Sequence, residues 1–213
     1  MSKEKVILFD TTLRDGQQTQ GVDFSVQDKV NIAKALDNIG IDYIEGGWPG
    51  ANPTDTKFFE KNNKFSNAKF TAFGMTKRSG RSADNDPQLR SLIDAHSDSI
   101  CLVAKTWDFH VDVALGISLE ENIEAIKDSV LSIKENNKEP LIDCEHFFDG
   151  YKSNPKFSFK CIEAALESGA EWVVLCDTNG GTLPNEIFQI VDEITRKFSG
   201  DKIGIHCHND TEN

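Results

Sequence analysis

The sequence predicts an α/β fold of the TIM (β/α)8-barrel class, and three observations support that prediction. Strand-like apolar runs alternate with helical patterns, as in parallel βα units. No glycine-rich dinucleotide-binding loop follows the first run, which disfavours a doubly wound sheet, the alternative with the same alternation. Polar residues capable of chemistry follow nearly every run, and barrel enzymes build their sites at the carboxyl ends of strands. The seven runs begin near Val6, Asp42, Lys69, Ser99, Leu141, Trp172 and Lys202.

The segments between these runs carry helix start and stop signals. Ser25 precedes apolar residues at helical spacing and Gly40 follows them, which predicts a helix between the two. Ser118 and Glu121 have the spacing of a capping box. Two further helices are expected to begin at a proline and to end at a glycine: Pro155 to Gly169, and Pro184 to Gly200.

The length of 213 residues fits one domain, residues 1–213. A complete barrel has an eighth strand and helix and typically runs to about 250 residues. We therefore expect an incomplete barrel of about seven βα units, the N-terminal catalytic portion of a longer enzyme. On this interpretation the eighth unit, any C-terminal subdomains and any regulatory domain lie outside the chain.

Composition limits the partners and the compartment. Acidic residues outnumber basic ones by 35 to 23, and this argues against general binding to nucleic acid or to an anionic membrane. The sequence has no apolar run of about 18 residues and no signal-peptide pattern. Four of the five cysteines lie in apolar strand-like runs, so we expect reduced thiols in a cytoplasmic protein.

The tripeptide His206-Cys207-His208 closes the last apolar run. Side chains alternate along a strand, so His206 and His208 are expected on one face with Cys207 opposed. Neutral imidazole is the commonest protein metal ligand. The sequence therefore predicts a chelating pair, with two hydrogen-bonded core histidines as the alternative.

A second candidate segment follows the first run. Residues 10–18 contain Asp, Thr, Arg and Gln side chains at a density that is costly to bury without a purpose. Asp15 with two imidazoles would give a mixed nitrogen and oxygen site suited to Mn, Zn, Co or Mg; a surface ion pair of Arg14 and Asp15 is the alternative. Glu45, at the end of the second run, is either an acceptor for Arg14 or a group with a chemical role.

Further candidates follow the fourth, fifth and sixth runs. Glu145 and His146 end the fifth run, and an acidic group inside a barrel needs a partner or a metal. Thr178 is placed to donate to a substrate carboxylate, or else simply to form a turn with the glycines that follow it. His110 is a candidate for the site, whereas His96 has the context of a helix-end histidine.

Four motifs together resemble the isopropylmalate synthase and homocitrate synthase branch of the DRE-TIM metallolyases. They span most of the chain in the family's order: residues 10–18, 43–50, 176–184 and 206–210. Within that family, residues 45–49 and 145–150 are most similar to the (R)-citramalate synthase subgroup. The resemblance implies condensation of acetyl-CoA with a 2-oxo acid, pyruvate for this subgroup, to give (R)-citramalate and CoA in branched-chain amino-acid biosynthesis.

The resemblance also implies roles for individual residues. Divalent-metal ligands would be Asp15, His206 and His208, with a further Asn ligand on the eighth strand. Arg14 would stabilise the charge developing on the keto oxygen, and Glu45 would orient Arg14.

In the same way, Thr178 would hold the substrate carboxylate. His110 is a candidate for substrate binding from its position after the fourth run, not from the resemblance. Glu145 is the third catalytic candidate after Arg14 and Glu45. The general base stays open between Glu145, His146 and, as in relatives, a histidine from a C-terminal region of the partner subunit. A homodimer is expected for the full-length enzyme. The alternatives are 2-isopropylmalate synthase, a lyase or aldolase of the hydroxymethylglutaryl-CoA lyase type, and a non-catalytic fragment.

Overall fold

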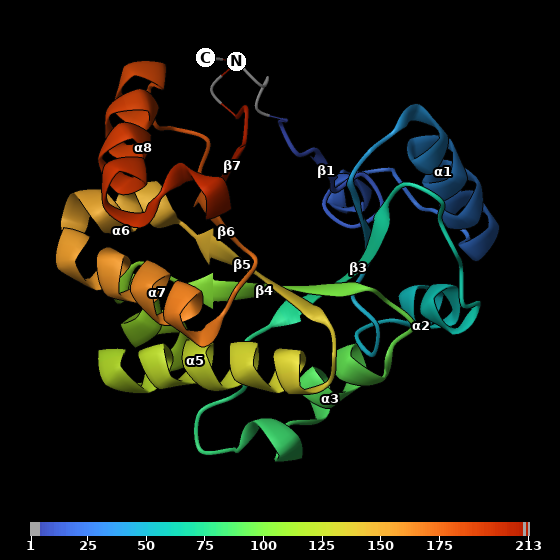
Figure 1. Cartoon of the computed structure of the whole chain (residues 1–213), viewed down its shortest axis with the longest axis horizontal. Helices are drawn as coiled ribbons and strands as arrows, with labels where there is room; N and C mark the ends of the chain where they lie inside the picture. The colour runs from blue at the N-terminus through green and yellow to red at the C-terminus, as the bar shows by residue number, and fades with distance from the viewer. Residues whose placement is uncertain (1–4, 211, 213) are drawn as a thin grey trace. The chain divides into compact units, whose positions relative to one another are not determined.

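The computed structural model describes residues 5–210 and 212, and the chain divides into two compact units. The first unit comprises the residues up to 74 together with 90–101, and the second comprises 75–89 and the residues from 102 onward. Figure 1 labels the elements along the chain. The strands of the described residues are β1 (Phe9–Asp10), β2 (Tyr43–Gly47), β3 (Lys69–Met75), β4 (Ser99–Lys105), β5 (Glu139–Glu145), β6 (Trp172–Asp177) and β7 (Ile203–Cys207).

Helices separate these strands, as the sequence predicts. They are α1 (Val26–Ile39), α2 (Pro53–Glu60), α3 (Pro87–Asp94), α4 (Asp108–His110), α5 (Leu119–Glu135), α6 (Phe147–Ser153), α7 (Pro155–Ser168) and α8 (Pro184–Phe198), with short turns of 3-10 or π-helix at Gly16–Gln18, Ala83–Asn85, Val111–Leu115 and Gly200–Lys202. The order of the strands in the sheet follows the chain. That order is the connectivity of a TIM barrel and confirms the predicted fold class.

In the first unit, β1 pairs with β2 and β2 pairs with β3, both in parallel. Helix α1 begins and ends as predicted. Ser25 and Asp28 form a reciprocal capping box, and Gly40 closes the helix in the left-handed conformation, with φ of 88°. The core contains stacked rings of Phe59 and Phe70, whose centroids are 4.6 Å apart.

The first strand is shorter than its apolar run predicted. It begins at Phe9, and the expectation of a buried strand from Val6 is wrong, because Val6 and Leu8 are 77% and 52% exposed. The backbone N–H of Leu8 donates to the Asp42 carboxylate over 3.0 Å, so a side chain takes the place of a strand partner there.

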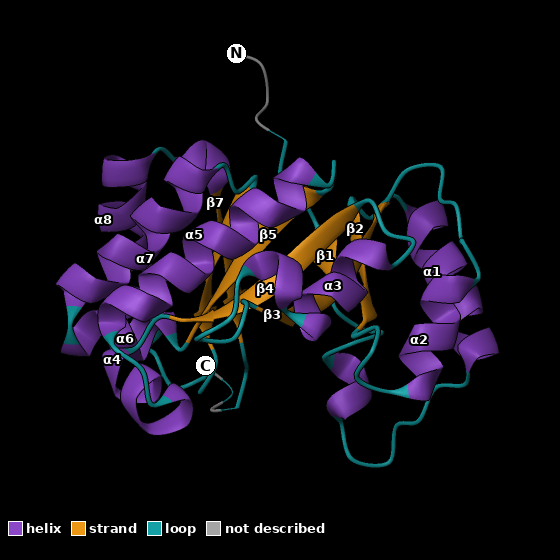
Figure 2. Cartoon of the chain, turned by 90° about the horizontal axis from the view of Figure 1, so that it is seen from below, coloured by secondary structure: helices purple, strands orange, loops and turns teal. Residues whose placement is uncertain are grey.

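In the second unit, β5, β6 and β7 pair in parallel, and Cys176 stands opposite His206. Helices α5 and α7 lie side by side against this part of the sheet (Figures 1 and 2). Ser118 and Glu121 form the predicted capping box. Pro155 and Pro184 stand in the first turns of α7 and α8.

The two predicted glycine helix ends differ in outcome. Gly169 closes α7 with φ of 96°, as expected. Gly200 does not close α8, which ends at Phe198. Ser199 takes the positive φ of 61° instead, and Gly200 opens a 3-10 turn that leads into β7.

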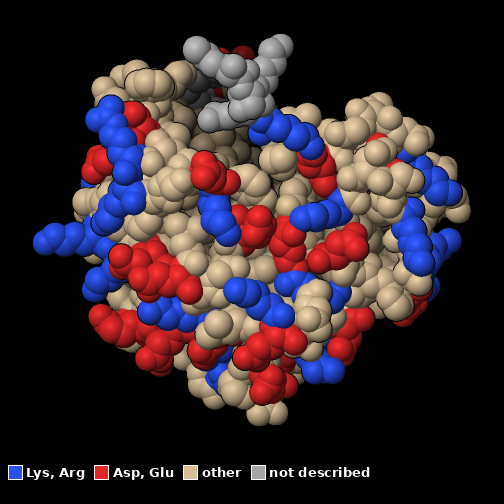
Figure 3. Space-filling model, in the orientation of Figure 1, with Lys and Arg blue, Asp and Glu red and all other residues tan. Residues whose placement is uncertain are grey.

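Burial and charge agree with the compositional analysis. Cys101, Cys144, Cys161 and Cys176 are buried and Cys207 is exposed, and no disulfide joins the described cysteines. Acidic and basic side chains are interspersed over the face drawn in Figure 3. Among the described residues, no helix is both long enough and apolar enough to cross a membrane.

One glycine of α6 tests how tightly this helix packs on the segment after β4. A methyl group on Gly150 would lie 2.5 Å from the Thr106 carbonyl oxygen and 2.8 Å from Trp107 Cα, both backbone atoms that have no rotamer to change. Gly150→Ala is therefore expected to lower the free energy of unfolding by about 1–3 kcal/mol, as overpacking does. Urea denaturation measures the loss. Gly181→Ala is the matched control, because its methyl group would meet nothing within 4 Å; equal losses for both variants would contradict the packing argument.

Candidate active site

In the first unit, a buried carboxylate holds the guanidinium of Arg14. Arg14 Nε donates to Glu45 Oε2 over 2.6 Å, and the Glu45 side chain is fully buried. The guanidinium carbon lies 3.8 Å from the ring centroid of Phe73. Trp48 packs edge-on against that ring, with centroids 5.7 Å apart. The structure thus places Glu45 against Arg14, as the sequence predicted, and the contact fixes the plane of the guanidinium.

The loop after β1 is a tight turn. The carbonyl oxygen of Thr11 accepts the backbone N–H groups of Arg14, Asp15 and Gly16 over 2.8 to 3.1 Å. Arg14 Nη1 also donates to Asp15 Oδ1 over 3.2 Å. This geometry gives Arg14 and Asp15 fixed backbone positions, although both lie outside regular secondary structure.

One residue of this arrangement was missed in the sequence. Lys29, on α1, is completely buried. Its ammonium donates to the carbonyl oxygens of Leu13 and Gly46 over 2.8 and 3.0 Å and forms an ion pair with Asp55. The signal was present, because Lys29 lies on the apolar stripe of α1, three residues after Val26 and four before Ala33.

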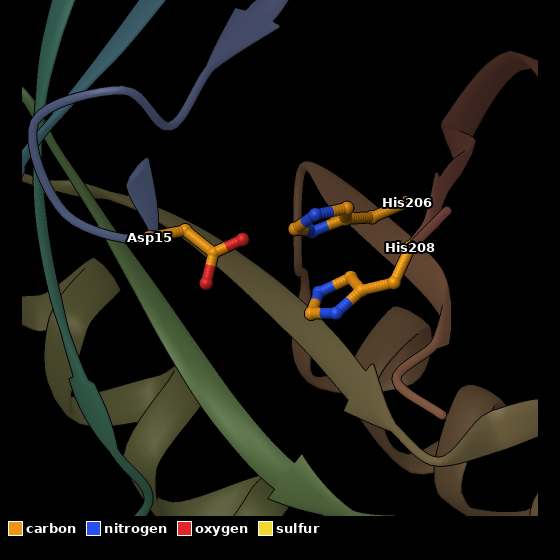
Figure 4. Close-up of side chains that lie close together, drawn as sticks. All are labelled: Asp15, His206 and His208. Atoms are coloured by element: carbon orange, nitrogen blue, oxygen red, sulfur yellow. The ribbon is translucent and has the colours of Figure 1, made fainter. Parts of the chain in front are cut away.

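In the second unit, His206 and His208 project from the same side of the chain at the end of β7 (Figure 4). Their ring centroids are 5.0 Å apart, and Cys207 between them is exposed. The strand alternation predicted from the sequence is therefore present. The backbone N–H of His208 donates to the Asp177 carbonyl oxygen, which continues the pairing with β6 one residue beyond the strand. Donor atoms of His206, Asp143 and Cys176 lie within 4.8 Å of one another.

A second cluster of titratable groups lies after β4 and β5. The rings of His110 and His146 meet edge to face with centroids 4.4 Å apart. Glu145 offers a carboxylate oxygen within 4.8 Å of donor atoms of both rings. Lys105 at the end of β4 forms an ion pair with Glu145. The structure therefore brings together three of the candidates from the sequence and places Lys105 beside them as the counterion of Glu145.

Backbone geometry fixes His146 in an unusual conformation. Its φ of 52° is left-handed, which a residue with a Cβ adopts at a cost. The Thr178 hydroxyl oxygen accepts the backbone N–H of His146 over 2.9 Å. Because a hydroxyl group both accepts and donates, its own proton stays available for another acceptor. His96, in contrast, is exposed in the loop after α3, as its context predicted.

Burial controls the protonation of His110. Desolvation lowers the pKa of His110 below its usual 6.5, and the neighbouring His146 and Lys105 act in the same direction, while Glu145 and Asp149 oppose them. The Nδ1 atoms of His110 and His146 have no hydrogen-bond partner among the described residues. At neutral pH His110 is therefore the uncharged imidazole.

The chain is similar to known proteins along nearly its whole length. The family model described as HMGL-like matches residues 5–212. The chain is 53% identical over 211 residues to the (R)-citramalate synthase of Aquifex aeolicus, covering 98% of this chain and 40% of that protein. It is also 53% identical over 209 residues to the (R)-citramalate synthase of Geobacter sulfurreducens, covering 97% and 39%. The chain thus spans about two fifths of the length of these relatives.

More distant matches have other activities in their names. The 2-isopropylmalate synthase of Sulfolobus acidocaldarius is 33% identical, over 99% of this chain and 52% of that protein. Among solved structures, the HMG-CoA lyase of Bacillus subtilis superposes with a TM-score of 0.80 at 18% identity, over 98% of this chain and 70% of that chain. At that identity the likeness establishes the fold alone, and it agrees with the predicted barrel class.

The lowered pKa of His110 predicts a pH dependence of stability. When the pKa is lower in the folded chain, the unfolded chain binds more protons as the pH falls through about 6.5, so stability is lost toward acid. NMR titration of the ring protons should place the midpoint of His110 below 6.5 in the folded protein. His110→Gln should reduce the loss of unfolding free energy between about pH 7 and pH 5. A folded-state midpoint above 6.5 would contradict the burial argument.

Proposed function

Because the chain belongs to the HMGL-like family, we propose that it carries a catalytic barrel portion of an (R)-citramalate synthase, which condenses acetyl-CoA with pyruvate and then releases CoA by hydrolysis of the thioester with water. The observation that carries the proposed chemistry is the guanidinium of Arg14, held in one plane by the buried carboxylate of Glu45. The similarity of the chain to two relatives named (R)-citramalate synthase, at 53% identity, favours pyruvate as the 2-oxo acid.

The proposed metal ligands are Asp15, His206 and His208 (Figure 4). The donor set fits a divalent metal: a carboxylate follows Arg14 in the turn after β1, and two imidazoles share one side of the chain at the end of β7. Such a mixed set accepts Mn, Zn, Mg or Co. A metal held by these three residues would supply Lewis-acid polarisation of the 2-oxo acid carbonyl.

Arg14 and Glu45 act as one unit in this proposal. The condensation turns the keto oxygen of pyruvate into an alkoxide, and a fixed cation beside that oxygen lowers the barrier. Oxyanion-hole donors indicate a contribution of about 3–4 kcal/mol for such a group. Glu45 contributes by holding the guanidinium at its Nε edge, while Nη1 donates to Asp15.

The second unit would supply the substrate contacts. Thr178 accepts the N–H of His146, and its own proton can be donated to the substrate carboxylate. His110, uncharged at neutral pH, is proposed to contact the substrate through its ring. Glu145 is proposed as a catalytic carboxylate that Lys105 holds in place. The acetyl methyl group must lose a proton to become the nucleophile, and Glu145 and His146 are proposed as candidates for the base that accepts it, beside a histidine of the partner subunit.

We also propose the partners and the compartment of the protein. Acetyl-CoA and pyruvate are the proposed substrates, and the full-length enzyme is proposed to be a homodimer. The prediction of a cytoplasmic protein is supported by the four buried cysteines, which form no disulfide among the described residues.

The substrate assignment is tested by mixing the full-length enzyme and acetyl-CoA with pyruvate or 2-oxoisovalerate and following free CoA with a thiol reagent. One or two methylene groups are worth about 1–3 kcal/mol in a pocket, so a preference for pyruvate of at least about tenfold in kcat/KM is expected. A preference for the branched acid would identify a 2-isopropylmalate synthase, as the relative at 33% identity is named. Cleavage of hydroxymethylglutaryl-CoA without either condensation would identify a lyase.

The metal proposal predicts different effects for neighbouring residues of β7. His208→Ala is expected to abolish divalent-metal binding measured by calorimetry. Cys207→Ala is expected to leave the affinity within about threefold, because its exposed side chain lies on the other side of the strand. The two substitutions shorten side chains at adjacent positions, so a general disturbance of the end of β7 would affect both variants alike. Loss of binding in both variants would contradict the strand-alternation argument.

A further inference from the structure

The buried ammonium of Lys29 contacts the backbone on both sides of the Arg14–Glu45 pair. One acceptor is the carbonyl oxygen of Leu13, directly before Arg14, at 2.8 Å. The other is the carbonyl oxygen of Gly46, directly after Glu45, at 3.0 Å. A single charged group therefore ties the turn after β1, at the peptide unit between Leu13 and Arg14, to the end of β2, at the carbonyl of the residue after Glu45.

Asp55 holds this ammonium at a fixed point. Its Oδ1 forms the ion pair with Lys29, and its Oδ2 accepts the backbone N–H of Trp48 and the side-chain amide of Asn52, each over 2.8 Å. A Cβ at Gly47, where φ is 136°, would lie 2.5 Å from the Asp55 carboxyl carbon, so only glycine lets the backbone pass this close. The carboxylate is thus anchored by the turn that follows β2.

Stability alone is a weak reason for this arrangement. Removing two charges from water costs several kcal/mol for each ion, and well-packed apolar residues of similar volume often serve equally well. Burial lowers the pKa of the Lys29 ammonium, and its hydrogen bond and Coulombic attraction to Asp55 act in the opposite direction. What an apolar replacement cannot provide is a set of directed donors to two separate carbonyl oxygens.

We propose that Lys29 is a positioning residue for the reaction: through the carbonyl oxygens of Leu13 and Gly46 it sets the position of the Arg14 guanidinium, and with it the adjacent Asp15. This inference rests on the proposed function. Arg14 acts on charge that develops only in the transition state, so its displacement lowers kcat more than it raises the KM for pyruvate. Displacement of a catalytic group by about 1 Å can cost about 100-fold.

The test uses the double variant Lys29→Met/Asp55→Asn in the full-length enzyme, because Lys29→Met alone would leave a buried charge unpaired. We expect folded protein with kcat lowered about 10- to 100-fold and with a KM for pyruvate within about threefold of the wild type. Asp55→Asn alone is the rescue variant: an uncharged Lys29 amine still has two N–H groups for the two carbonyl oxygens. Its kcat should stay within about fivefold of the wild type despite lower stability.

Asp37→Asn is the matched control for stability. Asp37 also lies on α1, is buried, and accepts the backbone N–H groups of Ser66, Asn67 and Ala68, none of which belongs to the candidate site. It should lower the Tm without changing kcat. A folded double variant with wild-type kcat would overturn the proposal, and so would a loss of kcat in Asp37→Asn as large as in the double variant.

A spectroscopic measurement separates this inference from the proposed activity. The NMR signal of the Arg14 Nε–H group, identified by its absence in Arg14→Lys, reports the hydrogen bond to Glu45. We expect this signal to shift or broaden in the double variant and to stay in place in Asp37→Asn. An unchanged signal in the double variant would overturn the positioning role, whether or not the wild type condenses acetyl-CoA with pyruvate. Failure of the wild type in that assay would overturn the proposed function instead.

Discussion

The hydrogen bond from Arg14 to Glu45 is the constraint around which the first unit is organised. A fully buried carboxylate has lost its hydration, and the guanidinium compensates part of that cost through a charge-assisted bond of 2.6 Å. The bond also removes rotational freedom from the long cationic side chain. Phe73 restricts the guanidinium further from its face. The result is a cation whose position is set by packing and hydrogen bonding rather than by the substrate.

In the second unit, backbone conformation rather than an ion pair fixes a candidate residue. His146, at the end of β5, is held in the left-handed conformation, which is strained for a residue with a Cβ. The Thr178 hydroxyl accepts the N–H group of that residue and so couples the end of β6 to the end of β5. Residues held in sparsely populated conformations persist when their surroundings over-determine them, and they cluster at functional sites. The edge-to-face contact with His110 provides that over-determination here.

The sequence predicted what depends on local pattern. Alternation of apolar runs with capped helices gave the seven strands and the barrel connectivity. The period of two along a strand placed His206 and His208 on one side and exposed Cys207. The two failures have different causes: a side chain that replaces a backbone partner, and a positive φ at a residue with a Cβ. The Asp42 carboxylate takes the N–H of Leu8, so the first strand starts late. The positive φ of Ser199 closes α8 where a glycine was expected.

The buried charges show most clearly why a pattern is insufficient. A lysine on an apolar helical stripe is ordinarily expected to reach out to water, and the position of Lys29 on the stripe of α1 signals burial without naming its partners. Its partners lie 16, 17 and 26 residues away, in three different segments. Lys105 and Glu145 are 40 residues apart, and their pairing depends on the ends of β4 and β5. Such pairs exist only once the strands are in register, so they are a product of the fold and not a signal that precedes it. The motif residues are visible in the sequence because their chemistry is conspicuous. The lysines and aspartates that hold them in place are of the same residue types as many solvent-exposed side chains. Only the folded structure shows which of them are buried and paired.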